Sequence, residues 1–176
     1  SVTITGTAAT VTRVPGQFRS DFGLNSSWYD TIAQFGADSL AAPVGSMLVI
    51  GDSVTQSVAD EFSSLITPAY PNTVIQACAG RGVVGAACLF PQTAPSLNLD
   101  GVNVFNALET PAIALIALGY NDDPTTYAAE LAQMISALTT RGVQRIIFVT
   151  MSTRTTKRTY ATANAALYAA AALDPK

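Results

Sequence analysis

Short apolar runs alternate with amphipathic stretches along most of this chain. From residue 46 onward, four runs have the length and composition of buried strands, at 47–50, 73–77, 112–118 and 145–150. Apolar residues spaced three and four apart predict helices that begin near Val54, Tyr127 and Tyr160. Strands that alternate with helices indicate an open, mostly parallel sheet with right-handed crossovers and helices on both faces. We therefore expect a three-layer, doubly wound α/β fold.

The first 45 residues follow a different pattern. Val2, Ile4 and Val11 lie in a threonine-rich, β-favouring stretch that a Pro-Gly pair interrupts. Residues 18–35 then carry many of the aromatic side chains. We expect residues 1–45 to form an N-terminal arm that packs on a main domain of residues 46–176. The alternative is that their aromatic side chains form a wall beside a functional site.

Polar turns follow the predicted strands. Residues 51–53, 80–82, 119–122 and 153–154 each come directly after one of them. Because the carboxyl ends of parallel strands meet at one edge of the sheet, these turns should lie together. Ligands of open α/β sheets bind at that edge, so the sequence predicts a functional site there.

Composition narrows the classes of partner. Charged residues make up only 12% of the chain, the net charge is −3 and the sequence pI is about 4.7. The sequence therefore lacks the excess of basic residues that is typical of proteins that bind nucleic acid or anionic lipid. No apolar run approaches the roughly 20 residues of a membrane span. We expect one domain without a nucleic-acid partner or a membrane span.

Two cysteines and the absence of histidine bear on metal binding and on location. Cys78 and Cys88 cannot complete a typical zinc shell without histidine, so we predict no metal. The two thiols either stay free and buried or form one local disulfide. We expect the disulfide, which would imply an oxidising, extracytoplasmic setting.

Three residues at the predicted edge have the chemistry of acyl transfer. Ser53 lies in a sharp strand-to-helix turn, where its hydroxyl would be exposed as a nucleophile. Gly80 can offer an unobstructed backbone N–H, and Asn121 its side-chain amide, to a developing oxyanion. The alternative for Ser53 is a structural role as the N-cap of the following helix.

These blocks resemble the SGNH (GDSL-type) hydrolase superfamily. Gly51-Asp52-Ser53 is similar to its nucleophile block, Gly80 to its oxyanion glycine, and residues 119–122 to its G-x-N-D block. A narrower resemblance is to the SGNH domains of acyltransferase-3-type proteins, on residues 77–81, 150–154 and Asn164. The resemblance covers residues 46–174. It implies a flavodoxin-like SGNH hydrolase fold, catalysis by Ser53, Gly80 and Asn121, and no cofactor.

The chain departs from that family in one respect. The family's catalytic histidine and supporting aspartate lie in a D-x-x-H block after a fifth strand, and this chain has no histidine. The block is either missing from this chain, supplied by another segment, or truly lost. We favour a missing segment, because a sheet that stops before its edge strand leaves an apolar edge exposed. Asp52, Asp122 and Asp123 would be feeble bases at an ordinary pKa near 3.9, so the chain alone should be almost inactive.

The resulting expectation is a serine esterase or O-acyltransferase that acts on acylated carbohydrate of the cell envelope or on a small ester. Arg81 and Arg154 would contact the substrate, or else form surface salt bridges. A second possibility is a catalytically inactive module that binds a glycan or a partner protein. A third is a piece of a larger complex, in which a second polypeptide segment completes the sheet.

Overall fold

The fold is seen in a computed structural model that describes residues 2–5, 10–13, 32–35, 45–89, 96–153 and 160–173. Its main sheet has five strands in the order β3-β7-β6-β4-β5. The four parallel strands are β4 (Met47–Gly51), β5 (Thr73–Ala77), β6 (Ile113–Ala117) and β7 (Arg145–Val149). This is the predicted flavodoxin-like arrangement, and all four predicted strands are confirmed.

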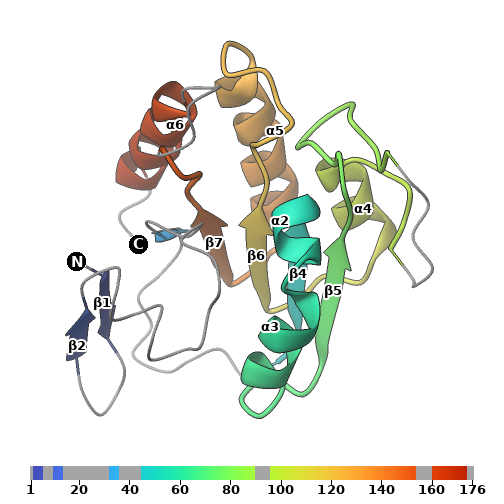
Figure 1. The fold of residues 1–176 in the computed structure, drawn as a ribbon, viewed down its shortest axis with the longest axis vertical. Helices are drawn as coiled ribbons and strands as arrows, with labels where there is room; N and C mark the ends of the chain where they lie inside the picture. The colour runs from blue at the N-terminus through green and yellow to red at the C-terminus, as the bar shows by residue number, and fades with distance from the viewer. Residues whose placement is uncertain are drawn as a thin grey trace.

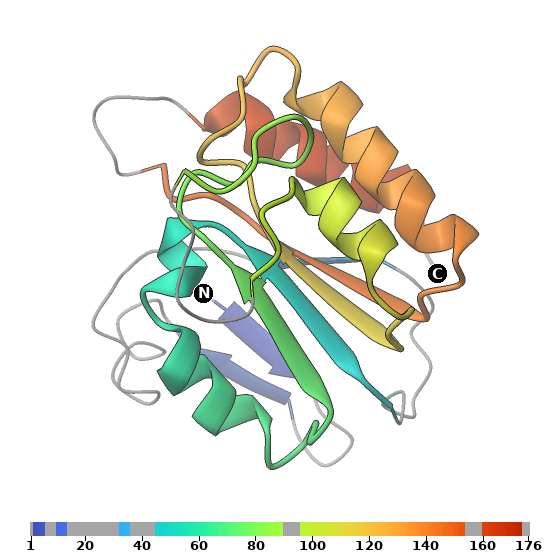
Figure 2. The ribbon, with the colours of Figure 1, turned by 90° about the vertical axis from the view of Figure 1, so that its right-hand side faces the viewer.

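Helices cover the two faces of this sheet unequally (Figures 1 and 2). One face carries α4 (Gly101–Ala107), α5 (Tyr127–Thr140) and α6 (Ala161–Leu173). The other face carries α3 (Ala59–Ile66), which follows the short α2 (Ser53–Gln56). The three-layer fold expected from the sequence is therefore confirmed.

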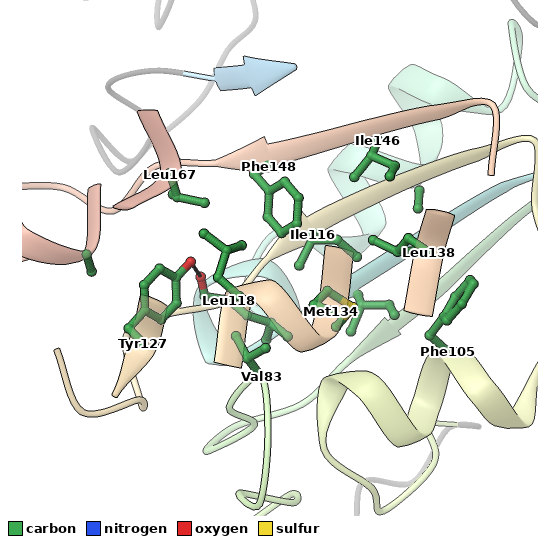
Figure 3. Packing of buried hydrophobic residues seen from close by; sticks show 14 of the residues in the cluster. Val83, Phe105, Ile116, Leu118, Tyr127, Met134, Leu138, Ile146, Phe148 and Leu167 are labelled. Carbon is green, nitrogen blue, oxygen red and sulfur yellow. Dashed lines mark hydrogen bonds between the residues drawn. The ribbon is translucent and has the colours of Figure 1, made fainter. Parts of the chain in front are cut away.

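Alternation along β4 divides the core into two clusters. Leu48 and Ile50 contribute to the larger cluster. That cluster lies between the sheet and helices α4, α5 and α6, from which Phe105, Met134 and Leu167 enter it (Figure 3). Met47 and Val49 point the opposite way, into the smaller cluster beneath α3. A strand buried on both faces has to be apolar at every position, which explains the unbroken apolar run before Gly51.

Two helices differ from the sequence expectation. The apolar face from Val54 to Leu65 predicts one helix, whereas the chain breaks it at Val58, which has non-helical dihedral angles, and starts α3 afterwards. Helix α4 was not predicted, because seven residues give too little periodicity. Its local signal is Asp100, whose carboxylate accepts a hydrogen bond from Asn103 N at 2.8 Å and caps the helix. Helix α5 ends just before Gly142, whose φ of 79° favours glycine.

Part of the N-terminal arm is a strand of the main sheet. Strand β3 (Ile32–Phe35) pairs antiparallel with β7, from Ile32 opposite Val149 to Phe35 opposite Ile146. The expectation of an exposed edge beside the last parallel strand is therefore wrong, because β3 covers it. The other two strands of the arm, β1 (Val2–Thr5) and β2 (Thr10–Arg13), form a separate antiparallel pair.

None of the helices in the described ranges is both long enough and apolar enough to span a lipid bilayer. This finding agrees with the absence of any membrane-span pattern in the sequence.

Candidate active site

The register of the central strands brings the predicted turns to one edge. Gly51, the last residue of β4, lies opposite Ala77 of β5 and Ala117 of β6. Cys78 N donates to the Gly51 carbonyl at 3.1 Å, so the segments after β4 and β5 leave the sheet together. The segment after β7 joins them, because Ser152 N donates to the Tyr120 hydroxyl at 2.6 Å. The predicted convergence of these turns on one edge is thus confirmed.

Ser53 is exposed at the start of α2, directly after this edge. The N-cap of the helix is Asp52, whose carboxylate accepts a hydrogen bond from Val54 N at 2.9 Å, so the alternative cap role for Ser53 is wrong. Among the described residues, no hydrogen bond involves the Ser53 hydroxyl. A Cβ on Gly51 would lie 2.2 Å from Thr55 Oγ1, which is why the turn before the serine needs a glycine. The local sequence therefore presents the Ser53 hydroxyl to solvent.

Gly80 and Asn121 lie together beyond β5 and β6. Asn121 Nδ2 donates to the Arg81 carbonyl at 3.0 Å, which holds the amide against the turn that contains Gly80. Gly80 has a φ of 86°, and a Cβ there would lie 2.2 Å from Leu89 Cγ. An amide nitrogen carries two N–H groups, so Asn121 can hold Arg81 and still donate to a ligand. The N–H groups of Ser53 and Gly80 have no acceptor within the described part of the chain.

Two buried carboxyl groups lie behind the turns. Burial raises the pKa of Asp52 from 3.8 to about 6, although hydrogen bonds from backbone N–H groups oppose the shift. Burial also raises the pKa of Asp122, and the neighbouring Glu130 and Asp52 add to that rise. Asp122 accepts a hydrogen bond from Val83 N at 2.7 Å. Both carboxyl groups support the turns by accepting hydrogen bonds from backbone N–H groups, and the ordinary carboxyl pKa expected from the sequence does not hold at these buried positions.

The predicted substrate contact by Arg81 does not agree with its position. Its side chain is fully buried, with 0% exposed area, and lies beneath the site. Nε donates to the Leu99 carbonyl at 3.0 Å, while Nη1 and Nη2 donate to the carbonyls of Gln76 and Leu97. Desolvation lowers the pKa of Arg81 to about 10, and Asp100 partly offsets it. Neither a substrate contact nor a surface salt bridge fits a guanidinium held in this way. Arg154, the other predicted contact, lies outside the described residues.

The predicted disulfide is confirmed between Cys78 and Cys88. It links the end of β5 to the chain that follows the Gly80 turn. Within the described residues, no group of three histidine, cysteine or acidic side chains lies in a position to hold a metal ion.

Residues that sequence reasoning did not single out hold the segment after β7. Tyr160 donates from its hydroxyl to the Tyr120 carbonyl at 3.3 Å, and the two rings meet edge to face with centroids 4.9 Å apart. Asn164, which the resemblance had selected, holds both backbone groups of Met151, accepting from its N and donating to its O. Tyr120 lies inside the G-x-N-D block and could have been found there, but nothing local marks Tyr160 as its partner.

A groove of about 320 Å³ opens beside this segment, between the chain after β7 and α6. Among the described residues, its lining includes Thr150, Thr153 and Tyr168 and carries no charged side chain. Thr150 and Met151 also line a small hollow next to Val54 and Tyr120, so the groove borders the edge that presents Ser53.

No protein-family model, curated protein or solved structure matches the chain.

Proposed function

We propose that this chain is the nucleophile-bearing part of a serine ester hydrolase or O-acyltransferase of the SGNH type. One observation carries the proposal. An exposed serine without a hydrogen-bond partner among the described residues follows β4, at the edge where the Asn121 amide is held against the Gly80 turn. A nucleophile beside backbone and amide donors is the arrangement that acyl transfer requires.

In the proposed reaction, Ser53 Oγ attacks the acyl carbon of an ester. Negative charge then develops on the former carbonyl oxygen, which the N–H groups of Ser53 and Gly80 and the Asn121 amide would stabilise. Collapse of this intermediate expels the alcohol and leaves an acyl-serine. Water attacking the acyl-serine gives hydrolysis, and a sugar hydroxyl gives transfer. Both outcomes restore the free serine.

The chain itself supplies no histidine to remove the serine proton. Asp52 and Asp122 have raised pKa values, but Asp52 accepts from Val54 N and Asp122 from Val83 N, and within the described residues neither forms a hydrogen bond with the Ser53 hydroxyl. We therefore assign the base to a histidine, with its supporting aspartate, from a segment outside this chain. Such a segment has to dock without adding a strand beside β7, or else displace β3 from that edge.

The substrate class rests on the resemblance and on the disulfide. SGNH domains of the acyltransferase-3 type act on acylated carbohydrate of the cell envelope. The Cys78–Cys88 bond is consistent with the oxidising, extracytoplasmic location that this substrate implies.

The absence of histidine favours a second candidate, a non-catalytic module that binds a glycan or a partner protein. The two candidates differ in whether Ser53 reacts. A module that only binds has no use for a serine nucleophile, whereas an enzyme without its base should respond to a base supplied in solution.

Imidazole in solution provides such a base. We expect it to stimulate hydrolysis of an aryl acetate by the chain, above the rate with imidazole alone, and Ser53→Ala to remove this stimulation. Ser57→Ala is the matched control, since Ser57 is an exposed serine one turn away whose hydroxyl binds only the Val54 carbonyl. Asn121→Ala should lower the stimulated rate by on the order of 10²-fold, the usual loss for one oxyanion donor. Asn106→Ala, at an exposed position in α4, should not.

An aryl phosphonate provides a second readout, because it should label Ser53 and add one phosphonyl group by intact mass. If the chain shows neither Ser53-dependent turnover nor labelling of Ser53, the enzyme proposal fails and the binding module takes its place.

A further inference from the structure

Two carboxyl groups behind the candidate site contact each other. Asp122 follows β6, Glu130 lies in the first turn of α5, and their side chains form a hydrogen bond. One oxygen of each has a separate donor, Val83 N for Asp122 and the Thr126 hydroxyl for Glu130, both at 2.7 Å. The remaining oxygens, Asp122 Oδ2 and Glu130 Oε2, are buried, and neither accepts a hydrogen bond from a backbone N–H, hydroxyl or basic group among the described residues.

Two carboxylates cannot hydrogen-bond to each other, because each has acceptors only. The contact between Asp122 and Glu130 requires a proton on one of them. Buried like charges in contact would otherwise repel, and an unpaired buried charge is costly.

We propose that Asp122 and Glu130 share one proton, and that this proton fixes the segment bearing Asn121, which makes Glu130 a positioning residue. The shared proton follows from the contact of the two carboxyl groups. The positioning role rests on the function proposed above for Asn121.

The groups around Asp122 favour the proton. Burial is the main cause of its raised pKa, the hydrogen bond and charge of Glu130 come next, and the charge of Asp52 adds to both. The hydrogen bond from Val83 N opposes them. Tyr127, the other titratable group that interacts with Asp122, has its own pKa raised by burial. The two charges that act on Asp122 among the described residues, those of Glu130 and Asp52, are both acidic and oppose the loss of its proton.

The pair is joined to the site through short connections. Asp122 is the residue after Asn121, and its Oδ1 lies so close to Gly82 that a Cβ there would be 2.5 Å away. The same oxygen binds Val83 N, in the segment that carries Gly80 and Arg81. Asp122 therefore lies between the two segments that the Asn121–Arg81 hydrogen bond joins. Ionisation of both carboxyl groups would push Asp122 away from α5 and shift Asn121 with it.

Carboxyl-carbon NMR of the ¹³C-labelled chain tests the shared proton. We expect the carboxyl signal of Asp122 to titrate near pH 7, well above the ordinary range of about 4. The side-chain amide signals of Asn121 should move with the same midpoint. If Asp122 titrates below about pH 5, no proton is shared and the proposal is overturned.

Two variants test whether the proton does the positioning. In Glu130→Gln, an amide can donate permanently to Asp122. In Asp122→Asn, the new amide can accept from Val83 N and donate to Glu130. Either change should hold the Asn121 signals constant between about pH 5 and 8. Glu109→Gln, at an exposed acid before β6, should leave the wild-type titration unchanged. Asn121 signals that still move in a folded variant would refute the positioning role.

The wild-type titration does not require either variant to fold, and it does not depend on Ser53. If the titration shows a shared proton but Ser53 never reacts, the inference about the Asp122–Glu130 pair stands and the proposed function fails. If Ser53 reacts but Asp122 titrates in the ordinary range, the proposed function stands and the shared proton is excluded.

Discussion

Replacing Arg81 by methionine should destabilise the protein through the backbone carbonyls that its guanidinium holds. Methionine keeps much of the side-chain volume but donates no hydrogen bond. The carbonyls of Gln76, Leu97 and Leu99 would each lose a donor. A buried acceptor left unsatisfied costs roughly 1–3 kcal/mol.

Part of this cost is offset, because methionine is easier to bury than a guanidinium. The pKa of Arg81 falls from 12.5 to about 10 on burial, and one pKa unit corresponds to about 1.4 kcal/mol. The offset is therefore about 3 kcal/mol. We expect the free energy of unfolding to fall by about 3 kcal/mol in Arg81→Met, a large part of the 5–15 kcal/mol typical of a small domain.

Urea unfolding at neutral pH without reductant measures this change. Arg141→Met is the matched control, since Arg141 also donates to two carbonyls, of Phe105 and Leu108, each at 2.7 Å. Arg141 is only partly buried, so water can replace its hydrogen bonds and the loss should be about 1 kcal/mol or less. Equal losses in the two variants would refute the structural account of Arg81. If Arg81→Met left the stability unchanged but removed Ser53-dependent turnover, the predicted contact between Arg81 and the substrate would be supported instead.

Three further predictions concern the same region. Reduction of the Cys78–Cys88 bond should lower the free energy of unfolding by about 3 kcal/mol, which is the entropic value for a loop of this length. Equal urea midpoints with and without reductant would contradict this prediction. Folded Asp52 holds its proton up to about pH 6 whereas the unfolded residue loses it near 3.8, so its contribution to stability is full below about pH 4 and is lost as the pH rises to about 6. Asp52→Asn keeps a capping oxygen and should flatten this part of the stability profile, whereas Asp60→Asn, at an exposed acid of α3, should leave it unchanged. Gly82→Ala should cost about 1–3 kcal/mol, because its Cβ would overlap Asp122 Oδ1, and a thermal melt equal to that of the wild type would exclude the overlap.

Sequence periodicity was enough for the elements that are long or uniformly apolar. β6 is apolar throughout because it is buried on both faces, and α5 repeats its buried side chains at helical spacing. The edge of the site could be predicted for the same reason, since parallel strands end together whatever side chains they carry. The position of Ser53 needed only a strand, a turn and a helix in succession.

The spacing of hydrophobic positions could not predict contacts between separate segments. The four residues of β3 resemble any short apolar stretch, and only the free edge of β7 makes them a strand. Arg81 was expected at the surface because charged side chains usually are, yet carbonyls from two other segments surround it. The contact of Asp122 with Glu130 depends on where the first turn of α5 lies relative to the end of β6.

The sequence by itself determined the four parallel strands, the helices α5 and α6 and the serine turn at the end of β4, because these follow from local spacing and from the apolar composition of buried strands. Only the tertiary structure decided which edge β3 covers, which arginine is buried and which carboxyl groups meet. Those outcomes depend on how the strands, helices and connecting segments pack against one another, and burial then raises or lowers the pKa values of the groups enclosed there.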